Sequence, residues 1–126
     1  MVGLLVVSHS AKAAEGIRDI AAEMGSAAAP VAAVGGDPEG GIGTDATAIG
    51  EALAALDADE VVVLVDLGSA VMNADLAIEG SDKTAVVADA PVLEGTVEAT
   101  VAATSPKATL ESVREAAERA RETSKR

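Results

Sequence analysis

The chain has 126 residues, enough for one domain with a substantial hydrophobic core. It contains no Cys and a single His, which excludes disulfides and thiolate metal sites and argues against a histidine-based metal centre. The formal net charge of −12 argues against nucleic acid as a partner, because nucleic acids are bound through basic surfaces.

The hydrophobic residues are spread over many short runs. None of these runs approaches the length of a membrane-spanning helix, and the N-terminus lacks the basic flank and long apolar core of a signal peptide. We therefore expect a soluble cytoplasmic protein that does not contact a membrane. The absence of Phe, Tyr and Trp also disfavours a flavin site or a base-stacking surface for RNA.

Apolar runs typical of buried strands alternate along the chain with apolar residues at helical spacing. The predicted strands cover residues 2–7, 28–34, 61–65 and 84–88. The predicted helices cover residues 11–24, 45–56, 70–79 and about 93–101, a last helix begins at Pro106, and a glycine-rich loop covers residues 35–44.

Single residues add detail to three of these elements. Pro30 suits a strand at the edge of a sheet. Met72 and Leu76 are expected to face inward from the third helix. Ser105 followed by Pro106 is typical of a cap and the first position of a helix.

The alternation of strands and helices predicts an α/β fold with a parallel sheet, right-handed crossovers and helices on both faces. The simplest arrangement is a three-layer open sheet of about four strands in the order 2-1-3-4. This order makes the junction of strands 1 and 3 the topological switch point, where α/β proteins bind ligands. The sequence shows no repeat and no second domain, so we expect residues 1–126 to form one domain whose last few residues fray.

The only histidine, His9, directly follows the first predicted strand, and Asp66 directly follows the third. In the predicted strand order these two side chains face each other across the crevice. A carboxylate on one imidazole nitrogen fixes the tautomer and leaves the other nitrogen free as a nucleophile. A lone histidine after a strand is more often structural than catalytic, and Asp66 could be an ordinary turn residue. The absence of Cys, Tyr and Trp leaves few other nucleophiles and favours the catalytic interpretation.

Three predicted helices begin near this point, after Ser10, at Thr44 or Asp45, and at Ser69. Backbone N–H groups and hydroxyls at helix N-termini form anion sites. A nucleophilic His9 inside an anion site suggests a phosphoryl acceptor, although such residues usually serve only as caps. The candidate phosphate- and partner-binding residues are Ser10, Gly43, Thr44, Gly68 and Ser69.

Four segments resemble one family in the right order along nearly the whole chain. The segments are Val6–Ser10, Ile42–Asp45, Asp66–Ala70 and Ala90–Gly95. Together they resemble the DhaM family, the phosphotransfer subunits of PEP-dependent dihydroxyacetone kinase, whose domain is similar to the enzyme IIA domain of mannose-type sugar phosphotransferase systems.

The resemblance implies a complete phosphotransfer role. It implies that His9 is transiently phosphorylated by the phosphocarrier HPr, that Asp66 is its partner, and that the chain forms a homodimer. The phosphoryl group would pass to ADP bound on the subunit DhaL, and the regenerated ATP would phosphorylate dihydroxyacetone held by DhaK. No bound cofactor is expected, since the phosphoryl group is carried covalently. Because the chain ends after one domain, we expect HPr and enzyme I to be separate proteins.

Two alternatives stay open. A mannose-type IIA domain would pass the phosphoryl group to a sugar-specific IIB domain, but no antiparallel fifth strand is evident after Pro91, which favours the kinase subunit. A non-enzymatic anion-binding or receiver-like module would never modify His9. A receiver needs an acidic cluster at the end of its first strand, and Ser8-His9-Ser10 does not supply one.

The negative charge is concentrated in the first part of the chain. Residues 1–106 contain 17 acidic and three basic residues, a net charge of −14, whereas residues 107–126 carry +2. Most of these carboxylates have no possible cationic partner and repel one another. The composition therefore suggests a halophilic, salt-accumulating host, in which the Debye length falls to about 3 Å at molar salt.

We predict that low salt destabilises the protein. The midpoint of thermal unfolding, followed by circular dichroism, should rise strongly as KCl increases from about 0.1 M to about 3 M, because the repulsion between carboxylates is screened. A midpoint that stays constant over this range would contradict the halophilic interpretation and leave the phosphotransfer hypothesis untouched.

Overall fold

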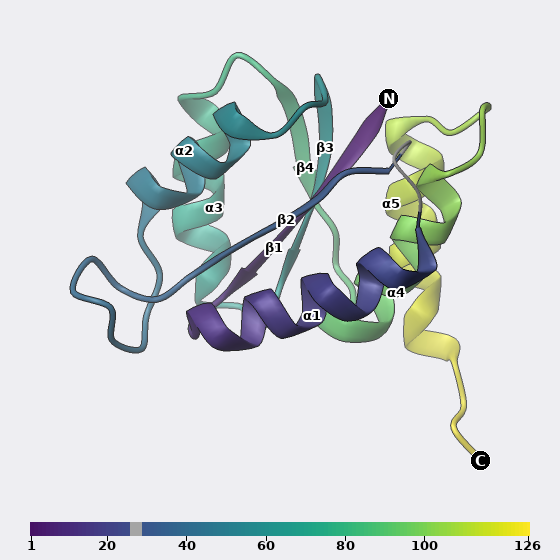
Figure 1. The fold of residues 1–126 in the computed structure, drawn as a ribbon, viewed down its shortest axis with the longest axis horizontal. Helices are drawn as coiled ribbons and strands as arrows, with labels where there is room; N and C mark the ends of the chain where they lie inside the picture. The colour runs from purple at the N-terminus through teal and green to yellow at the C-terminus, as the bar shows by residue number, and fades with distance from the viewer. Residues whose placement is uncertain (26–28) are drawn as a thin grey trace.

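A computed structural model describes residues 1–25 and 29–126. The strands are β1 (Val2–Ser8), β2 (Val31–Gly35), β3 (Glu60–Val65) and β4 (Thr84–Val87). The helices are α1 (Ala11–Met24), α2 (Ala46–Ala55), α3 (Ala70–Glu79), α4 (Val92–Ala103) and α5 (Leu110–Arg119), followed by the 3₁₀ turn η1 (Ala120–Glu122). The strands form one parallel sheet in the order β2-β1-β3-β4, which confirms the predicted α/β topology (Figure 1).

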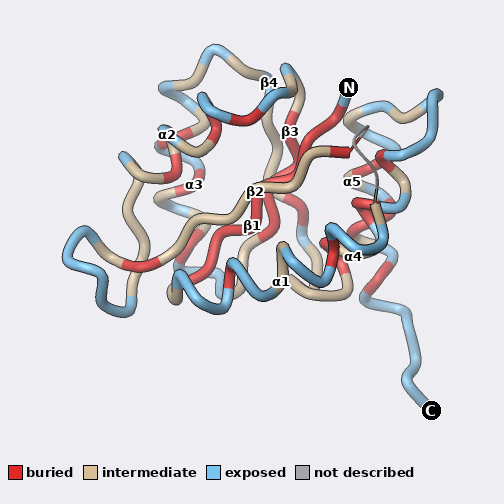
Figure 2. The backbone as a smooth tube through the Cα atoms, in the orientation of Figure 1, coloured by how far each residue is buried: buried red, intermediate tan, exposed pale blue. Residues whose placement is uncertain are grey.

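The sheet is built around β1, every residue of which is buried (Figure 2). β1 pairs with β2 on one side and with β3 on the other. Such a strand is hydrophobic on both faces, which explains the continuous apolar run in the sequence. β2 and β4 lie at the two edges, and the carbonyl of Pro30, just before β2, accepts a hydrogen bond from Leu4 N–H (2.9 Å).

Helices cover both faces of the sheet. On one face α1 crosses the sheet beside α4 and α5, and on the other face α2 packs beside α3 (Figure 1). Alternate residues of β1 contribute to the two cores, with Leu4 in the core against α4 and α5, and Leu5 in the core against α2 and α3. None of the helices in the described ranges is long and apolar enough to cross a membrane.

The inward orientation expected for Met72 and Leu76 is wrong. The buried face of α3 consists of the alanines Ala70, Ala74 and Ala77, while Met72 is 75% exposed and Leu76 is 54% exposed. Alanines spaced four and three residues apart share one helix face and let the helix approach the sheet closely. The larger side chains of α3 are therefore displayed on the surface.

The start predicted for the last helix is also wrong. Residues 104–107 form a turn, and α5 begins at Leu110 after a capping box made by Thr109 and Ser112. The Thr109 hydroxyl accepts from Ser112 N–H (3.0 Å), and the Ser112 hydroxyl accepts from Thr109 N–H (2.9 Å). This reciprocal cap satisfies the N–H groups of Thr109 and Ser112 at the start of α5, where the first turn of a helix has no internal acceptors.

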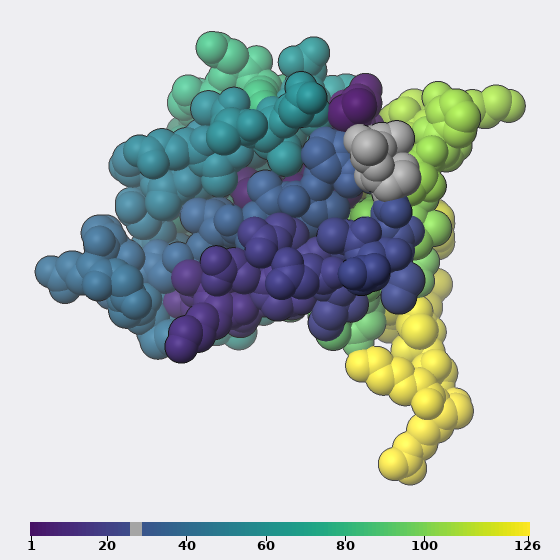
Figure 3. Space-filling view, in the orientation of Figure 1, coloured from purple at the N-terminus to yellow at the C-terminus, as the bar shows by residue number. Residues whose placement is uncertain are grey.

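The other boundaries differ only slightly from the prediction. β2 begins at Val31, whereas the predicted strand began at Ala28, which lies outside the described residues. Residues 123–126 are exposed and have no regular structure (Figure 3).

The carboxyl ends of all four strands lie at one edge of the sheet, as parallel strands require, and the loops there are closely packed. A Cβ atom added to Gly35, at the end of β2, would lie 2.7 Å from the backbone oxygens of both Ser8 and Ser10. Glycine at this position therefore lets β2 approach the segment that carries His9.

We predict that Gly35→Ala destabilises the fold by about 1–3 kcal/mol, because the clash is with backbone atoms that cannot rotate away. Gly16→Ala is the matched control: a Cβ at Gly16 in α1 meets nothing within 4 Å. The control should stabilise the protein by about 0.5–1 kcal/mol through helix propensity. Urea unfolding of both variants tests the pair, and equal stabilities would show that the close approach at Gly35 is not rigid.

Candidate functional site

The site lies at the centre of the sheet edge, where β1 and β3 end side by side. Val7 of β1 is in register with Val65 of β3, and Asp66 N–H extends the ladder by donating to the Val7 carbonyl (3.2 Å). Just beyond this pair, the side chains of His9 and Asp66 meet, with 2.9 Å between His9 Nδ1 and Asp66 Oδ1. The structure thus brings together the two residues that the strand order predicted to face each other.

Four hydrogen bonds hold the Asp66 carboxylate. Its Oδ2 accepts from the Ser8 hydroxyl (2.8 Å) and from His9 N–H (2.9 Å). Its Oδ1 accepts from Leu67 N–H (2.8 Å) and faces the His9 ring nitrogen. Each oxygen therefore has two neighbours, and the plane of the carboxylate is fixed.

Burial by itself would raise the pKa of Asp66. The hydrogen bonds from His9 N–H, the His9 ring, the Ser8 hydroxyl and Leu67 N–H outweigh burial and lower the pKa below the ordinary value for aspartate. This ionised carboxylate stabilises the fold above the pKa of the unfolded chain, and the contribution is lost as the pH falls through the lowered folded value. At neutral pH Asp66 accepts hydrogen bonds only, so His9 Nδ1 carries a proton.

The other ring nitrogen, Nε2, faces Ser69. Ser69 precedes α3 with helical backbone angles (φ −64°, ψ −19°), and its side chain makes no capping bond. Its hydroxyl instead lies 2.9 Å from His9 Nε2. Because Nδ1 holds the proton, Nε2 accepts this hydrogen bond, and its lone pair points away from the carboxylate.

Ser10 is used as a helix cap. Its hydroxyl accepts from Ala13 N–H (3.3 Å) at the start of α1, and its own N–H donates to the Ser8 hydroxyl (3.1 Å). In the part of the chain that the structure describes, the N–H groups of Ala11 and Lys12 have no acceptor. The N-terminus of α1 thus offers two free donors next to His9.

The loop before α2 and the start of α2 lie against His9 and α3. Gly43 N–H donates to the His9 carbonyl (2.9 Å), and the Thr44 hydroxyl oxygen accepts from the Asn73 side chain of α3 (2.8 Å). Asp45, not Thr44, caps α2 by accepting from Thr47 N–H (3.2 Å). Gly43 and Thr44 therefore hold the end of the glycine-rich loop against His9 and α3. The N-terminus of α2 carries the negative charge of its cap, Asp45.

The glycine-rich loop is organised by Asp37. Its Oδ1 accepts from Glu39 N–H (2.9 Å) and from Gly41 N–H (2.7 Å). Gly36 and Gly40 have φ values of 90° and 84°, which side chains rarely tolerate, so the loop needs glycine there. Figure 3 shows this loop, in blue, projecting from the body of the molecule.

Two polar side chains of the site, Ser8 and Asn73, are not among the residues predicted from the sequence. Ser8 was visible in the segment Ser8-His9-Ser10, but only the fold shows that its hydroxyl reaches Asp66. Asn73 carried no signal, since a polar residue inside a helix is usually a surface residue. The predicted Gly68 lies in the turn between Asp66 and Ser69, where its carbonyl accepts from Val71 N–H (3.0 Å).

Large apolar side chains are exposed on the segments that carry the site residues. We call Ile42, Leu67, Met72 and Leu76 the apolar rim, and all four are more than half exposed. Ile42 adjoins the Gly43 contact to His9, Leu67 follows Asp66, and Met72 lies one turn beyond Ser69. Exposed apolar groups gathered around polar chemistry are typical of a protein docking surface.

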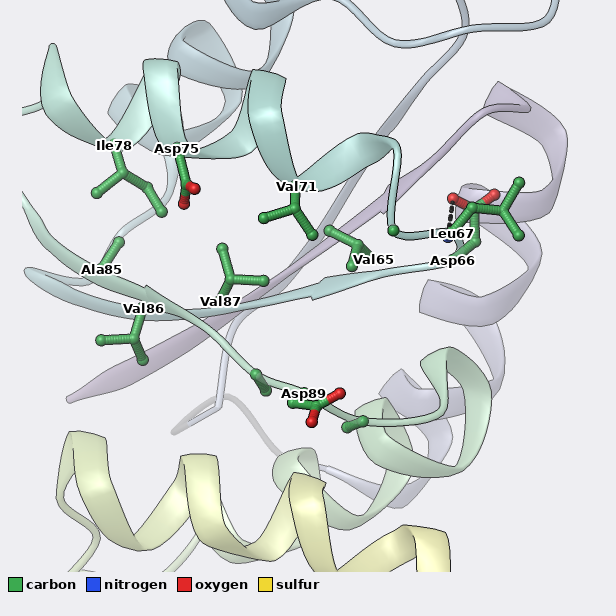
Figure 4. A pocket seen from close by; sticks show the side chains of 13 residues that line it. Val65, Asp66, Leu67, Val71, Asp75, Ile78, Ala85, Val86, Val87 and Asp89 are labelled. Carbon is green, nitrogen blue, oxygen red and sulfur yellow. Dashed lines mark hydrogen bonds between the residues drawn. The ribbon is translucent and has the colours of Figure 1, made fainter.

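A cleft of about 700 Å³ opens beside the site, between α3 and the free side of β4 (Figure 4). Its walls are mainly apolar, with Val65, Val71 and Val87 pointing into it, and the carboxylates of Asp75 and Asp89 lie along it (Figure 4). Within the described residues, no group of three or more His, Asp or Glu side chains could hold a metal ion.

The chain matches known proteins over most of its length. Residues 3–114 match the family model of the PTS system fructose IIA component, EIIA-man. The fold is similar to the crystal structure of the unknown-function protein EF1359, with a TM-score of 0.79 and 29% identity over 92% of each chain.

Several curated relatives are dihydroxyacetone kinase subunits. The chain is 42% identical over 113 residues to the phosphoryl donor subunit DhaM of Escherichia coli K12, covering 83% of this chain but only 24% of that protein. It is 34% identical over 117 residues to the phosphotransferase subunit DhaM of Lactococcus lactis, covering 93% of this chain and 94% of that protein. With DhaM 1 of Listeria innocua the identity is 38% over 93 residues, and 74% of each is covered.

The chain therefore spans about a quarter of the E. coli relative and nearly all of the Lactococcus relative. The match to the family model and the coverage of the short relatives show that this chain belongs to the EIIA-man family and, within it, to the DhaM subunits.

Proposed function

We propose that this chain carries a phosphoryl group on His9 Nε2 in a PEP-dependent dihydroxyacetone kinase system. The observation that carries the proposal is the contact between His9 Nδ1 and Asp66 at 2.9 Å, which leaves Nε2 unprotonated and able to act as the nucleophile. The names of the DhaM relatives give the system. The phosphoryl group is held covalently, and no bound cofactor takes part.

In the first step, the Nε2 lone pair attacks the phosphorus of a phosphohistidine on the donor, HPr. The new N–P bond forms as the N–P bond of the donor breaks, and the donor imidazole leaves with the bonding electrons. The His9 ring then carries positive charge, since Nδ1 keeps its proton. Asp66, 2.9 Å away, stabilises that charge through the same hydrogen bond.

In the second step, a terminal phosphate oxygen of ADP bound on DhaL attacks the phosphorus. The N–P bond breaks, and its electrons return to Nε2. ATP forms on DhaL and then phosphorylates dihydroxyacetone on DhaK. Ser69 is positioned to turn its hydroxyl from Nε2 to a phosphoryl oxygen, and the free N–H groups of Ala11 and Lys12 add further donors.

The apolar rim is evidence that both the phosphoryl donor and the phosphoryl acceptor are proteins. A small-molecule substrate is usually held in an enclosed pocket, whereas the four side chains of the apolar rim are more than half exposed. We infer that HPr and DhaL dock in turn on the apolar rim and bring their phosphoryl groups to the same nitrogen.

We also propose that the chain forms a homodimer. Among the described residues β4 has no strand partner on its outer side, and the apolar cleft lies beside that edge. The molar mass in solution, measured by light scattering, should equal that of two chains; a single-chain mass would contradict this assembly.

We predict that Asp66→Asn slows phosphorylation of His9 by about ten- to ten-thousand-fold and leaves the fold intact, because the amide can stabilise the wrong tautomer. The protein is incubated with phosphoenolpyruvate, enzyme I and HPr, and an acid-labile, alkali-stable phosphate adduct is followed by mass spectrometry. His9→Ala is the control and should take up none. Phosphate that persists in His9→Ala would show that another residue is the acceptor.

The acceptor distinguishes the kinase subunit from a sugar-specific IIA domain. Phosphorylated protein should lose its phosphate when ADP-loaded DhaL is added, and ATP should appear in equal amount. Transfer to a sugar-permease IIB domain, with none to ADP, would place the chain in a sugar transport system instead.

A further inference from the structure

Ser8 occupies an unusual position for a hydroxyl. It is the last residue of β1 and is only 1% exposed. Its oxygen accepts from Ser10 N–H (3.1 Å), and its single proton lies toward Asp66 Oδ2 (2.8 Å). Ser10 N–H can only donate and an ionised carboxylate can only accept, so the direction of both hydrogen bonds is fixed.

The hydroxyl of Ser8 joins two parts of the site. Through Ser10 N–H it contacts the residue that caps α1, and through Oδ2 it contacts the carboxylate that faces the His9 ring. The remaining donors to Asp66, apart from the ring itself, are the backbone N–H groups of His9 and Leu67. In the part of the chain that the structure describes, the Asp66 carboxylate is thus bonded by two side chains, those of His9 and Ser8. Of these two, Ser8 does not take part in the proposed chemistry and can be changed independently.

We propose that Ser8 is a positioning residue for phosphoryl transfer, whose hydroxyl holds the plane of the Asp66 carboxylate against His9 Nδ1. This inference rests on the proposed transfer through His9. Ser8 touches neither Nε2 nor the phosphoryl group, and it acts only through Asp66.

Loss of this hydroxyl has two physical consequences. Asp66 Oδ2 keeps one donor in place of two, so the carboxylate can rotate away from the ring at the moment when the ring becomes positive. The pKa of Asp66 also rises, because the Ser8 hydrogen bond is one of the contacts that lower it. The titratable groups near Asp66 are His9 at the end of β1 and, along the cleft, Asp75 of α3 and Asp89 after β4.

The test compares Ser8→Ala, Ser8→Thr and a control, Thr100→Val. Thr100 is fully buried in α4, and its hydroxyl donates to the Thr96 carbonyl (2.7 Å), so the control also removes one buried hydroxyl. The rate of His9 phosphorylation by phospho-HPr is measured against pH in a single turnover. The Asp66 carboxyl is titrated by carbon NMR in the unphosphorylated protein.

We expect Ser8→Ala to lower the rate on the order of tenfold and to move the Asp66 titration to higher pH, because a hydrogen bond to the ionised carboxylate is lost. Ser8→Thr keeps a hydroxyl and should restore most of both. Thr100→Val should match the wild type in both, whatever its effect on the unfolding temperature.

Two outcomes would overturn the inference on Ser8 alone, in a wild-type protein that does take up phosphate. One is a Ser8→Ala variant with wild-type rate and titration. The other is a slower variant whose Asp66 titration is unchanged, since that marks a merely structural role. A wild-type protein that takes up no phosphate on His9 would overturn the proposed function itself, and with it any role of Ser8 in transfer.

Discussion

The parallel pairing of β1 with β3 is the constraint on which the site depends. The two strands are far apart in the sequence, and their register sets Val7 beside Val65, so the residues that follow meet at the sheet edge. A shift of one residue would turn the side chains to opposite faces and separate His9 from Asp66. Because β1 and β3 are also the most completely buried strands, hydrophobic packing fixes the same register that the chemistry needs.

The groups available to a phosphoryl group at the proposed site are dipoles more than charged side chains. Residues 1–106 contain only Lys12, Arg18 and Lys83 as basic residues. Arg18 pairs with Asp19, and Lys83 donates to the Leu56 carbonyl, far from His9 in the fold. The donors left at the site are a hydroxyl and helix N–H groups, together with Lys12 in the first turn of α1. A site with few cations is consistent with the proposed carrier role, since a site with several cations would bind the phosphoryl group more tightly and slow its release.

Sequence reasoning predicted the strands, their order and the meeting of His9 with Asp66 because these follow from long apolar runs and from the topology of parallel sheets. It failed on the orientation of α3, where alanines form the buried face and the larger Met72 and Leu76 point outward. Alanine is only weakly hydrophobic, so the hydrophobic pattern of α3 is dominated by Met72 and Leu76, although these two side chains face solvent.

The hydrogen bonds of the site could not be predicted from the sequence, for a different reason. The Ser8 contact to Asp66 and the Asn73 contact to Thr44 depend on side-chain rotamers at the ends of separate elements. No spacing rule relates Ser8 to a residue 58 positions later. The sequence can therefore indicate the candidate nucleophile His9 and its partner Asp66, whereas the groups that hold Asp66 in place are visible only in the structure.

The outward turn of α3 has a consequence for function. If donor and acceptor both reach Nε2, they use the same face in succession, because Asp66 occupies the other side of the ring. A surface that binds two different proteins in turn cannot be rigidly complementary to the shape of either one. Met72, an unbranched and polarisable side chain on the apolar rim, can repack against different surfaces. Burying alanines against the sheet thus leaves the larger side chains of α3 exposed, which fits the proposed exchange of two partners on one face.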